Sequence, residues 1–217
     1  MKKYWIIVAL IFVNCLFDSC GILGPSPICF DVGFTGVDNF SYSNFQRLEA
    51  GDTTAVNQFV ILLEGTNNMS TCAVGFSTGA SLMAESPVYI LLNNIVDLSI
   101  KSNAALNNDL PSGAELRDWF ELVGIDKGCS LNQQAAIDCI DNFSDGWPDD
   151  DLKWVINDLA TYGGLFDEDL SSTHLYGLDL TLDLVGEETS HVFTLRFEFE
   201  NGVIQEFNSP PVLLKGL

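Results

Sequence analysis

Positive charge is scarce in this sequence. Lysine and arginine together number 9, against 30 aspartates and glutamates, so the formal net charge of the 217 residues is −21. A chain this acidic repels nucleic acids and anionic lipid surfaces, so we expect no nucleic-acid partner. The charge suits divalent cations, a basic ligand or simply a well-solvated surface.

Long apolar runs are also scarce. The only one, Tyr4 to Phe17, has 14 residues, and a membrane-spanning helix needs about 20. Lys2 and Lys3 precede this run, and a short apolar segment after positive charges is typical of an export signal. We therefore predict that the chain is exported and has no membrane-spanning helix.

An A-x-A site for ordinary signal peptidase is missing after the apolar run. Ser19 directly precedes Cys20, which resembles a lipobox in a relaxed form, although Phe17 and Asp18 depart from the strict pattern. We predict a signal peptide over residues 1–19 and a lipid on Cys20 that anchors the protein to the membrane. In the alternative, Cys20 is a disulfide cysteine released by an unconventional cleavage.

The predicted compartment bears on the other cysteines. Residues 21–25 lack an acidic surface-export tag, which favours an outer-membrane anchor facing the periplasm over display outside the cell. In that oxidising compartment, chain proximity suggests the pairs Cys29–Cys72 and Cys129–Cys139. The second pair requires that no single helix runs from Cys129 to Cys139. A single helix would hold its Cα atoms about 15 Å apart, whereas a disulfide needs about 5–6 Å.

Alternation of apolar and polar residues predicts strands in most of the mature chain. It is strongest near the C-terminus, in residues 178–184 and 193–199. Asn201-Gly202 then predicts a type I′ turn before residues 203–207, and Pro210-Pro211 interrupts the ladder. Residues 35–57 are polar and predicted to be turn-rich. Further strands are predicted at 29–34, 59–63, 88–92, 95–100 and 212–214.

The spacing of residues predicts helices in three segments. Ser112 and Glu115 are spaced like a capping box, and a second helix is predicted from Ser130 with Ile140 facing inward. A third is predicted to begin near Asp149. The apolar positions of the first are Leu116, Trp119, Phe120 and Val123, and those of the third are Leu152, Val155, Ile156 and Leu159.

A sheet that is apolar on one face needs a second layer to cover it. We therefore predict a mainly β fold, an antiparallel Ig-like β-sandwich over residues 29–217, with a helical insertion at about 112–172. Residues 20–28 are predicted to form a tether between the lipid and this domain.

One segment matches a catalytic motif. Gly75 to Gly79 reads G-x-S-x-G, the nucleophile elbow of α/β-hydrolases. That elbow needs a buried parallel strand before it and a helix after it, but Pro87 would end such a helix early and the later hairpins are antiparallel. Either His174 or His191 would have to act as the base for Ser77. We favour a chance match in a Gly- and Ser-rich loop, and we predict that the protein is not an enzyme.

A second segment suggests a metal. Asp141, Asp145 and Asp149 lie in a stretch resembling a calcium loop, so calcium is the one cofactor that the sequence suggests. The EF-hand register fails, because Phe143 holds the third position and Leu152 the position of the bidentate glutamate. The alternative is an acidic helix N-terminus. With two histidines in the chain, zinc is disfavoured.

Three other features are compatible with binding or modification. His191 is expected to be a packed or edge histidine. Trp147, Trp154 and Trp119 are conceivable sugar-stacking residues, although Trp119 is predicted to lie in the core. Asp52-Thr53-Thr54 resembles a three-residue O-glycosylation acceptor of Bacteroidota, with Thr53 as the acceptor.

Several features together resemble a family of uncharacterised lipoproteins from Bacteroidota. These are the relaxed lipobox, Cys29-Phe30-Asp31-Val32, Cys72 near the end of a strand block, and the C-terminal FEFENGVIQEFNSPPVLLK. The resemblance covers mainly residues 20–123 and 173–217. It implies a secreted β-sandwich, and it supplies no activity and no catalytic residues.

Taken together, the sequence predicts a lipid-anchored, non-catalytic binding or structural module of the cell envelope with a protein or glycan ligand. A calcium- or glycan-binding domain of the adhesion type is the first alternative, and a hydrolase using Ser77 is the second.

Overall fold

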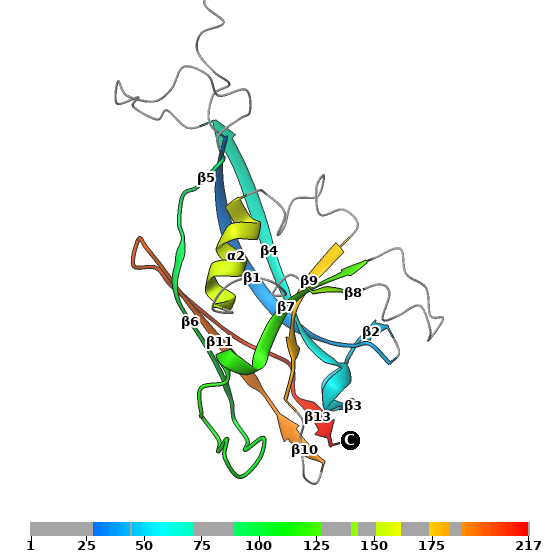
Figure 1. The fold of residues 1–217 in the computed structure, drawn as a ribbon. Helices are drawn as coiled ribbons and strands as arrows, with labels where there is room; N and C mark the ends of the chain where they lie inside the picture. The colour runs from blue at the N-terminus through cyan, green and yellow to red at the C-terminus, as the bar shows by residue number, and fades with distance from the viewer. Residues whose placement is uncertain are drawn as a thin grey trace, which may run out of the picture. The chain divides into compact units, whose positions relative to one another are not determined.

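A computed structural model describes residues 28–43, 45–71, 89–126, 140–142, 151–161, 174–182 and 188–216. The chain divides into two compact units, and Phe30–Met69 with Leu91–Leu217 form the larger one. The elements discussed below belong mainly to this larger unit. It is mainly β, and α2 (Leu152–Thr161) is the α-helix among its described residues (Figure 1). Within the described ranges, no helix has the length and apolar character needed to cross a bilayer.

The largest sheet has seven described strands. Its centre is antiparallel: Leu178 pairs with Ile61 on one side and with Leu122 on the other. Another strand, β5 (Tyr89–Leu91), pairs with β1 off the main path. The strands of the main path are β2 (Gln46–Arg47), β1 (Ile28–Ser41), β4 (Phe59–Thr71), β9 (His174–Leu180), β7 (Phe120–Asp126) and β8 (Ile140–Asn142).

Two sheets of three described strands complete the fold. The first, which we call the hairpin sheet, is antiparallel and contains β12 (Ile204–Asn208), β11 (Phe193–Phe199) and β6 (Ile95–Ser102). The second contains β10 (Thr189–His191), β13 (Val212–Lys215) and β3 (Thr53–Ala55), of which β13 and β3 are parallel. Short 3₁₀ turns occur at η1 (Val56–Gln58) and η2 (Arg117–Trp119).

The main core lies between the large sheet and the hairpin sheet. In β11 the buried and half-buried residues alternate, and Phe193 and Phe197 are 0 % exposed. Phe193 stacks on Phe59 of β4 with ring centroids 5.3 Å apart, and Phe34 of β1 stacks on Phe197 at 4.0 Å. Aromatic rings from both sheets thus interleave, which confirms the predicted β-sandwich.

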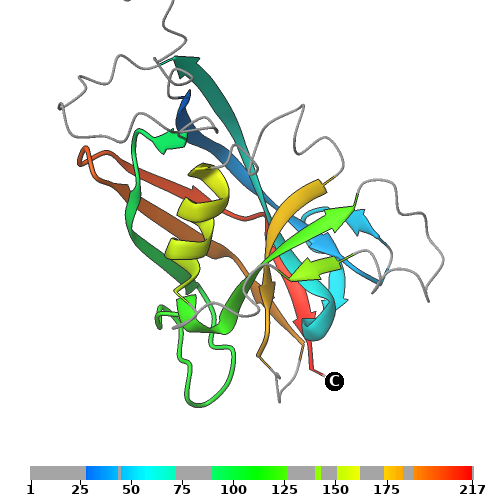
Figure 2. The same cartoon turned by 45° about the horizontal axis from the view of Figure 1, so that its top comes forward.

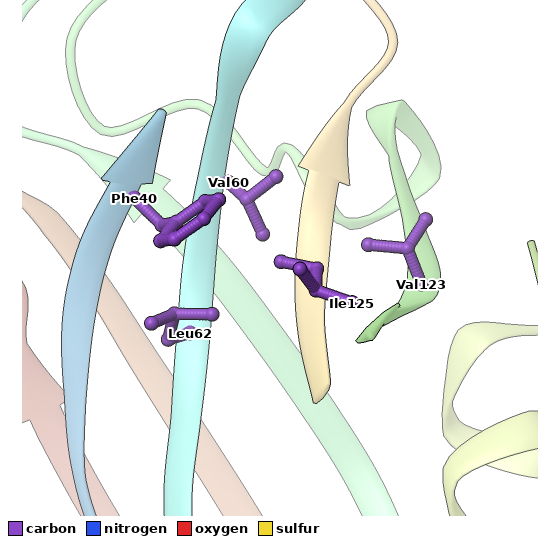
Figure 3. Close-up of a cluster of buried hydrophobic side chains, with 5 residues drawn as sticks. All are labelled: Phe40, Val60, Leu62, Val123 and Ile125. Carbon is purple, nitrogen blue, oxygen red and sulfur yellow. The ribbon is translucent and has the colours of Figure 1, made fainter. Parts of the chain in front are cut away.

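The large sheet also carries a second apolar cluster, shown in Figure 3. It consists of Phe40, Val60, Leu62, Val123 and Ile125. Tyr42, Phe45 and Leu175 pack against it as partly buried neighbours. Because the sheet is apolar on two faces, the central strand β4 has a continuous apolar run from Phe59 to Leu63 instead of an alternating pattern.

The helix predicted from Ser112 is wrong, because residues 117–119 form η2 and residues 120–126 form the interior strand β7. Phe120 contacts Phe193 in the main core, whereas Val123 joins the second cluster. Apolar residues on both faces of this strand reproduced helical spacing by coincidence. Glu115 accepts hydrogen bonds from the backbone N–H of Ile100 and the hydroxyl of Ser99, at 2.8 and 2.6 Å, so it fixes the segment to β6 instead of capping a helix.

The predicted insertion at about 112–172 is therefore only partly helical, because β7 and β8 are strands of the large sheet. The helix predicted from Ser130 lies mostly outside the described residues, and its inward residue Ile140 begins β8 instead. The third prediction is confirmed by α2, on which Leu152, Val155 and Ile156 are buried. Leu159 is half-buried, while Ala160 is 2 % exposed.

Strand lengths also differ from the prediction. Residues 35–41 continue β1, and β2, β3 and η1 follow, so the segment 35–57 is more regular than its polar composition suggested. Residues 35–38 are exposed or half-buried, which explains why their hydrophobic signal is weak. β4 likewise continues past Leu63 as far as Thr71.

The hairpin at Asn201-Gly202 is confirmed, but the predicted type I′ turn is wrong. Phe199 N–H donates to the Val203 carbonyl at 2.9 Å, so the loop has three residues, 200–202. Gly202 has φ +79°, whereas Asn201 does not have the positive φ that type I′ requires. The Asn201 side chain accepts from Val203 N–H instead, which suits a three-residue loop with a left-handed glycine.

Candidate functional site

The G-x-S-x-G motif lies outside the described residues, so the hydrolase hypothesis stays a prediction. Ser77 lies outside the described residues, and for His174 the description covers only the backbone, at the start of β9. His191, on β10, is 1 % exposed; its Nδ1 lies 2.9 Å from Ser102 Oγ, and its ring stacks on Phe193. Burial lowers the pKa of His191 to about 4. It is a packed core histidine, as predicted.

The calcium prediction stays a prediction. Asp141 lies in β8 with its side chain outside the description, and Asp145 and Asp149 are outside the described residues. In the part of the chain that is described, no three His, Cys, Asp or Glu side chains are grouped as metal ligands would be. Asp151 is described at the start of α2, where its Oδ1 accepts from Lys153 N–H at 3.1 Å. Asp151 thus caps the N-terminus of α2, in line with the alternative of an acidic helix N-terminus.

The predicted modification and disulfide sites remain predictions. Cys20, Cys72, Cys129 and Cys139 lie outside the described residues, and Cys29 is buried in β1. Thr53 is exposed in β3, and its hydroxyl donates to Glu188 at 3.2 Å. Its exposure leaves it accessible to a glycosylating enzyme.

The tryptophans differ from expectation in one respect. Trp119 is 40 % exposed, so the prediction that it lies in the core is wrong. The error follows from the missing helix, since Trp119 ends η2 and does not lie on a helix face. Trp154, on α2, is 54 % exposed, and Trp147 lies outside the described residues.

Exposed apolar side chains gather around one end of the hairpin sheet. Two hydrogen bonds join the elements at this end. Glu200 N–H of the hairpin loop donates to the Asn94 carbonyl, just before β6, at 2.9 Å, and Lys153 Nζ of α2 donates to the Val96 carbonyl of β6 at 3.4 Å. The β11–β12 hairpin, β6 and α2 lie on the same side of the molecule in both views (Figures 1 and 2). We call five exposed residues the hairpin-end surface: Leu92 of the β5–β6 connection, Val96 of β6, Trp154 of α2, and Val203 and Ile204 of the hairpin.

Charged residues adjoin this surface on the outer face of the hairpin sheet. Arg196 of β11 contacts Glu198 at 2.9 Å and Asp97 of β6 at 3.6 Å. All three side chains are at least 30 % exposed, so we expect each pair to contribute little to stability. An apolar area beside exposed charges has the composition of a ligand-binding surface.

A pair of acidic residues lies within the large sheet. Asp179 of β9 stands directly opposite Glu121 of β7. Burial, with a smaller effect of Glu121, raises the pKa of Asp179 to about 7. Burial and the nearby Asp179 raise the pKa of Tyr42. Among the described residues, neither Asp179 Oδ1 nor the Tyr42 hydroxyl has a hydrogen-bond partner. This arrangement makes one carboxyl group titrate near neutral pH, and it identifies no ligand by itself.

Comparison with other proteins finds no match to this chain among protein-family models, curated proteins or solved structures.

Sequence reasoning missed both of these arrangements. The sequence predicts that Val203 and Ile204 belong to a strand, but nothing in it shows that their hairpin is joined to Asn94, next to β6. The alternation in residues 178–184 places Asp179 on the polar face of its strand, between Leu178 and Leu180. Val123 and Ile125 lie on the same face of the large sheet as Asp179. Their apolar character is the signal that could have indicated that this sheet is buried on both faces.

Proposed function

We propose that the protein is an exported, lipid-anchored and non-catalytic binding module of the cell envelope. Its anchor is the lipid on Cys20, and its binding site is the hairpin-end surface. The proposal is supported by the arrangement of apolar side chains: five of the six large hydrophobic side chains that are exposed among the described residues belong to this surface.

Exposure of these side chains favours a binding role. Leaving a large apolar side chain in water forgoes about 1.5–3 kcal/mol of burial free energy, and a partner that covers it recovers that energy. Scattered exposed residues need no such explanation. Here the residues lie on the hairpin, on the segment 92–96 and on α2, and hydrogen bonds join this segment to the other two, so one partner could cover several of the residues.

The anchor rests on the signal-like N-terminus and the Ser19-Cys20 pair. We expect a Cys20→Ala variant to leave the membrane fraction and to lose its incorporated palmitate. Fractionation and labelled-palmitate uptake in the producing cells measure both effects. Ser19→Ala is the control, because alanine is also a small residue before the cysteine and should preserve processing. Unchanged membrane association of the Cys20→Ala variant would remove the basis of the anchor.

The binding site can be tested by photo-crosslinking in the same cells. A benzoyl-phenylalanine introduced at Ile204 should give a discrete crosslinked product, because Ile204 is 53 % exposed within the hairpin-end surface. The same probe at Asn108, which is exposed in the β6–η2 connection, should give none. Equal crosslinking at the two positions, or none at Ile204, would contradict the proposed site.

A glycan ligand is the second candidate, and the exposure of Trp154 favours it. An exposed indole ring can stack on the apolar face of a sugar, and Trp154 is 54 % exposed. A crosslinked product at Ile204 that is sensitive to glycosidase instead of protease would favour the glycan. Calcium binding through Asp141, Asp145 and Asp149 and hydrolysis by Ser77 remain hypotheses, which calorimetry with calcium chloride and ester-substrate assays can check.

A further inference from the structure

The two edges of the hairpin sheet differ in whether their outward backbone groups have hydrogen-bond partners. The edge formed by β6 is closed by side chains and neighbouring backbone. Asn157 of α2 accepts from Ile95 N–H at 2.8 Å and donates to the Ile95 carbonyl at 2.9 Å, as a neighbouring strand would. The outward backbone groups of β6 have the following further partners: Val96 carbonyl with Lys153, Leu98 carbonyl with Arg117, Ile100 N–H with Glu115, Ile100 carbonyl with Leu116 N–H, and Ser102 carbonyl with Gly113 N–H.

The other edge, formed by β12, is open. Phe199 N–H donates to the Val203 carbonyl and Ser209 N–H donates to the Phe193 carbonyl, so the odd-numbered residues of β12 direct their backbone groups toward β11. The even-numbered residues, Ile204, Glu206 and Asn208, therefore direct theirs away from the sheet. Among the described residues, none of these outward backbone groups has a hydrogen-bond partner. β12 thus presents three N–H and three C=O groups at an unpaired edge.

The side chains of this edge provide recognition beyond the backbone. Ile204, Glu206 and Asn208 are all exposed, and they lie on the same outer face of the strand. Glu206 stands opposite Arg196 in the register, yet Arg196 contacts Glu198 and Asp97 instead. Within the described part of the chain, Glu206 has no ion-pair partner. An added strand would meet one unpaired negative charge at its centre and an apolar side chain two residues away.

A second copy of this chain fits the edge poorly. In the antiparallel register that pairs all three outward residues, Glu206 would face Glu206 of the other copy, and directly opposed like charges are destabilising. The net charge of −21 adds to the repulsion between copies. The central glutamate therefore acts against self-pairing, while leaving the edge open to a strand of opposite charge.

We infer that the β12 edge binds an extended segment of a partner protein, which adds to the hairpin sheet as a fourth strand. The segment carries a lysine or arginine opposite Glu206 and, two residues later in the antiparallel orientation, an apolar residue opposite Ile204. Backbone hydrogen bonds supply the affinity and these two side chains supply the specificity. The inference rests on the proposed binding function and names its class of partner.

The first test uses synthetic peptides and the full-length processed protein in detergent micelles. The probe is a fluorescein-labelled peptide with the core Thr-Val-Lys-Val-Val flanked by serines. Fluorescence anisotropy should show saturable binding. A peptide with glutamate in place of the lysine should bind about threefold more weakly, and the Glu206→Lys variant should reverse this preference. Methylation of the peptide N–H groups that face β12 should weaken binding at least tenfold.

The second test changes the edge itself. Proline at position 206 removes an outward N–H without removing a bond to β11, so Glu206→Pro should weaken binding of the lysine peptide about tenfold. Glu206→Gln keeps the N–H and should weaken it only about threefold. Far-UV circular dichroism checks that both variants fold. Equal binding by the wild type and the Glu206→Pro variant, or equal binding of the methylated and unmethylated peptides, would overturn the inference.

The cell experiment separates this inference from the proposed function. If the crosslink at Ile204 persists in the Glu206→Pro variant, the binding surface stands and strand addition is wrong. If no crosslink forms even in the wild-type background, the proposed function is wrong. The peptide experiments alone then decide whether the β12 edge binds an added strand. Sedimentation of the wild-type protein should show a monomer. A dimer abolished by Glu206→Pro would mean that a second copy occupies the edge.

Discussion

A Gly177→Val variant is expected to lower the free energy of unfolding by more than about 3 kcal/mol, and Gly177→Ala by about 1–3 kcal/mol. Gly177 lies in β9 between Leu62 of β4 and Val123 of β7. A Cβ at this position would clash with Val60 Cγ1 and would lie 3.1 Å from the Ile61 carbonyl oxygen. Both obstacles belong to the central strand, which is held on both sides and cannot yield easily.

Urea unfolding followed by circular dichroism measures this effect. Gly33→Ala is the matched control, because Gly33 lies in β1 of the same sheet and, among the described residues, an added Cβ would meet only Thr66 Oγ1, at an ordinary 3.7 Å. We expect it to be neutral or slightly stabilising. Adding Val60→Ala to Gly177→Ala should recover part of the loss, because it removes the clashing methyl group. A Gly177→Val protein as stable as the Gly33→Ala control would show that the sheet is not packed in this way.

The second large effect is expected from Asp179→Asn, which should stabilise the protein at pH 8 by up to about 4 kcal/mol. Burial raises the pKa of Asp179 in the folded protein to about 7 from 3.8. Between these two values the folded state holds a proton that the unfolded state has released. The contribution of this group is therefore most favourable below about pH 4 and is lost as the pH rises toward 7. The asparagine variant lacks this loss.

The free energy of unfolding measured from pH 4 to pH 8 tests the assignment. The wild type should lose stability across this range, and Asp179→Asn should lose much less. Glu206→Gln, which removes one exposed negative charge, is the control for the overall charge of the chain and should follow the wild-type profile. Glu121→Gln should make the wild-type decline smaller and end it at a lower pH, because the charge of Glu121 helps to raise the pKa of Asp179. Parallel profiles for the wild type and Asp179→Asn would contradict the role of this carboxyl group.

Much of the fold was predictable wherever one face of a strand is apolar. The alternation in residues 193–199 matches the burial of β11 residue by residue, and the helical spacing after Asp149 matches α2. Prediction failed in residues 116–123, because a strand buried on both faces contains apolar residues at every kind of spacing. Only the pairing with β9, about 55 residues further along the chain, decides between the two readings.

The candidate binding surface was much less predictable than the fold. Trp154 could be identified as a candidate from its residue type, but the other residues of the surface come from the segment around β5 and β6 and from the β11–β12 hairpin. The open state of the β12 edge depends on which strand lies at the end of the sheet, and this is a property of topology. Alternation identified β12 as a strand, and a strand pattern does not reveal which of its two sides is paired.

The position of β13 has a consequence for the order in which the protein can fold. This strand, residues 212–215, lies between β10 and β3, and its parallel partner β3 is at residues 53–55. The sheet that contains them therefore cannot close until residues 212–215 are available, however early β3 was synthesised. Closing so long a loop costs entropy before any contact repays it. We expect slow folding, because β3 stays without its parallel partner until β13 is in place.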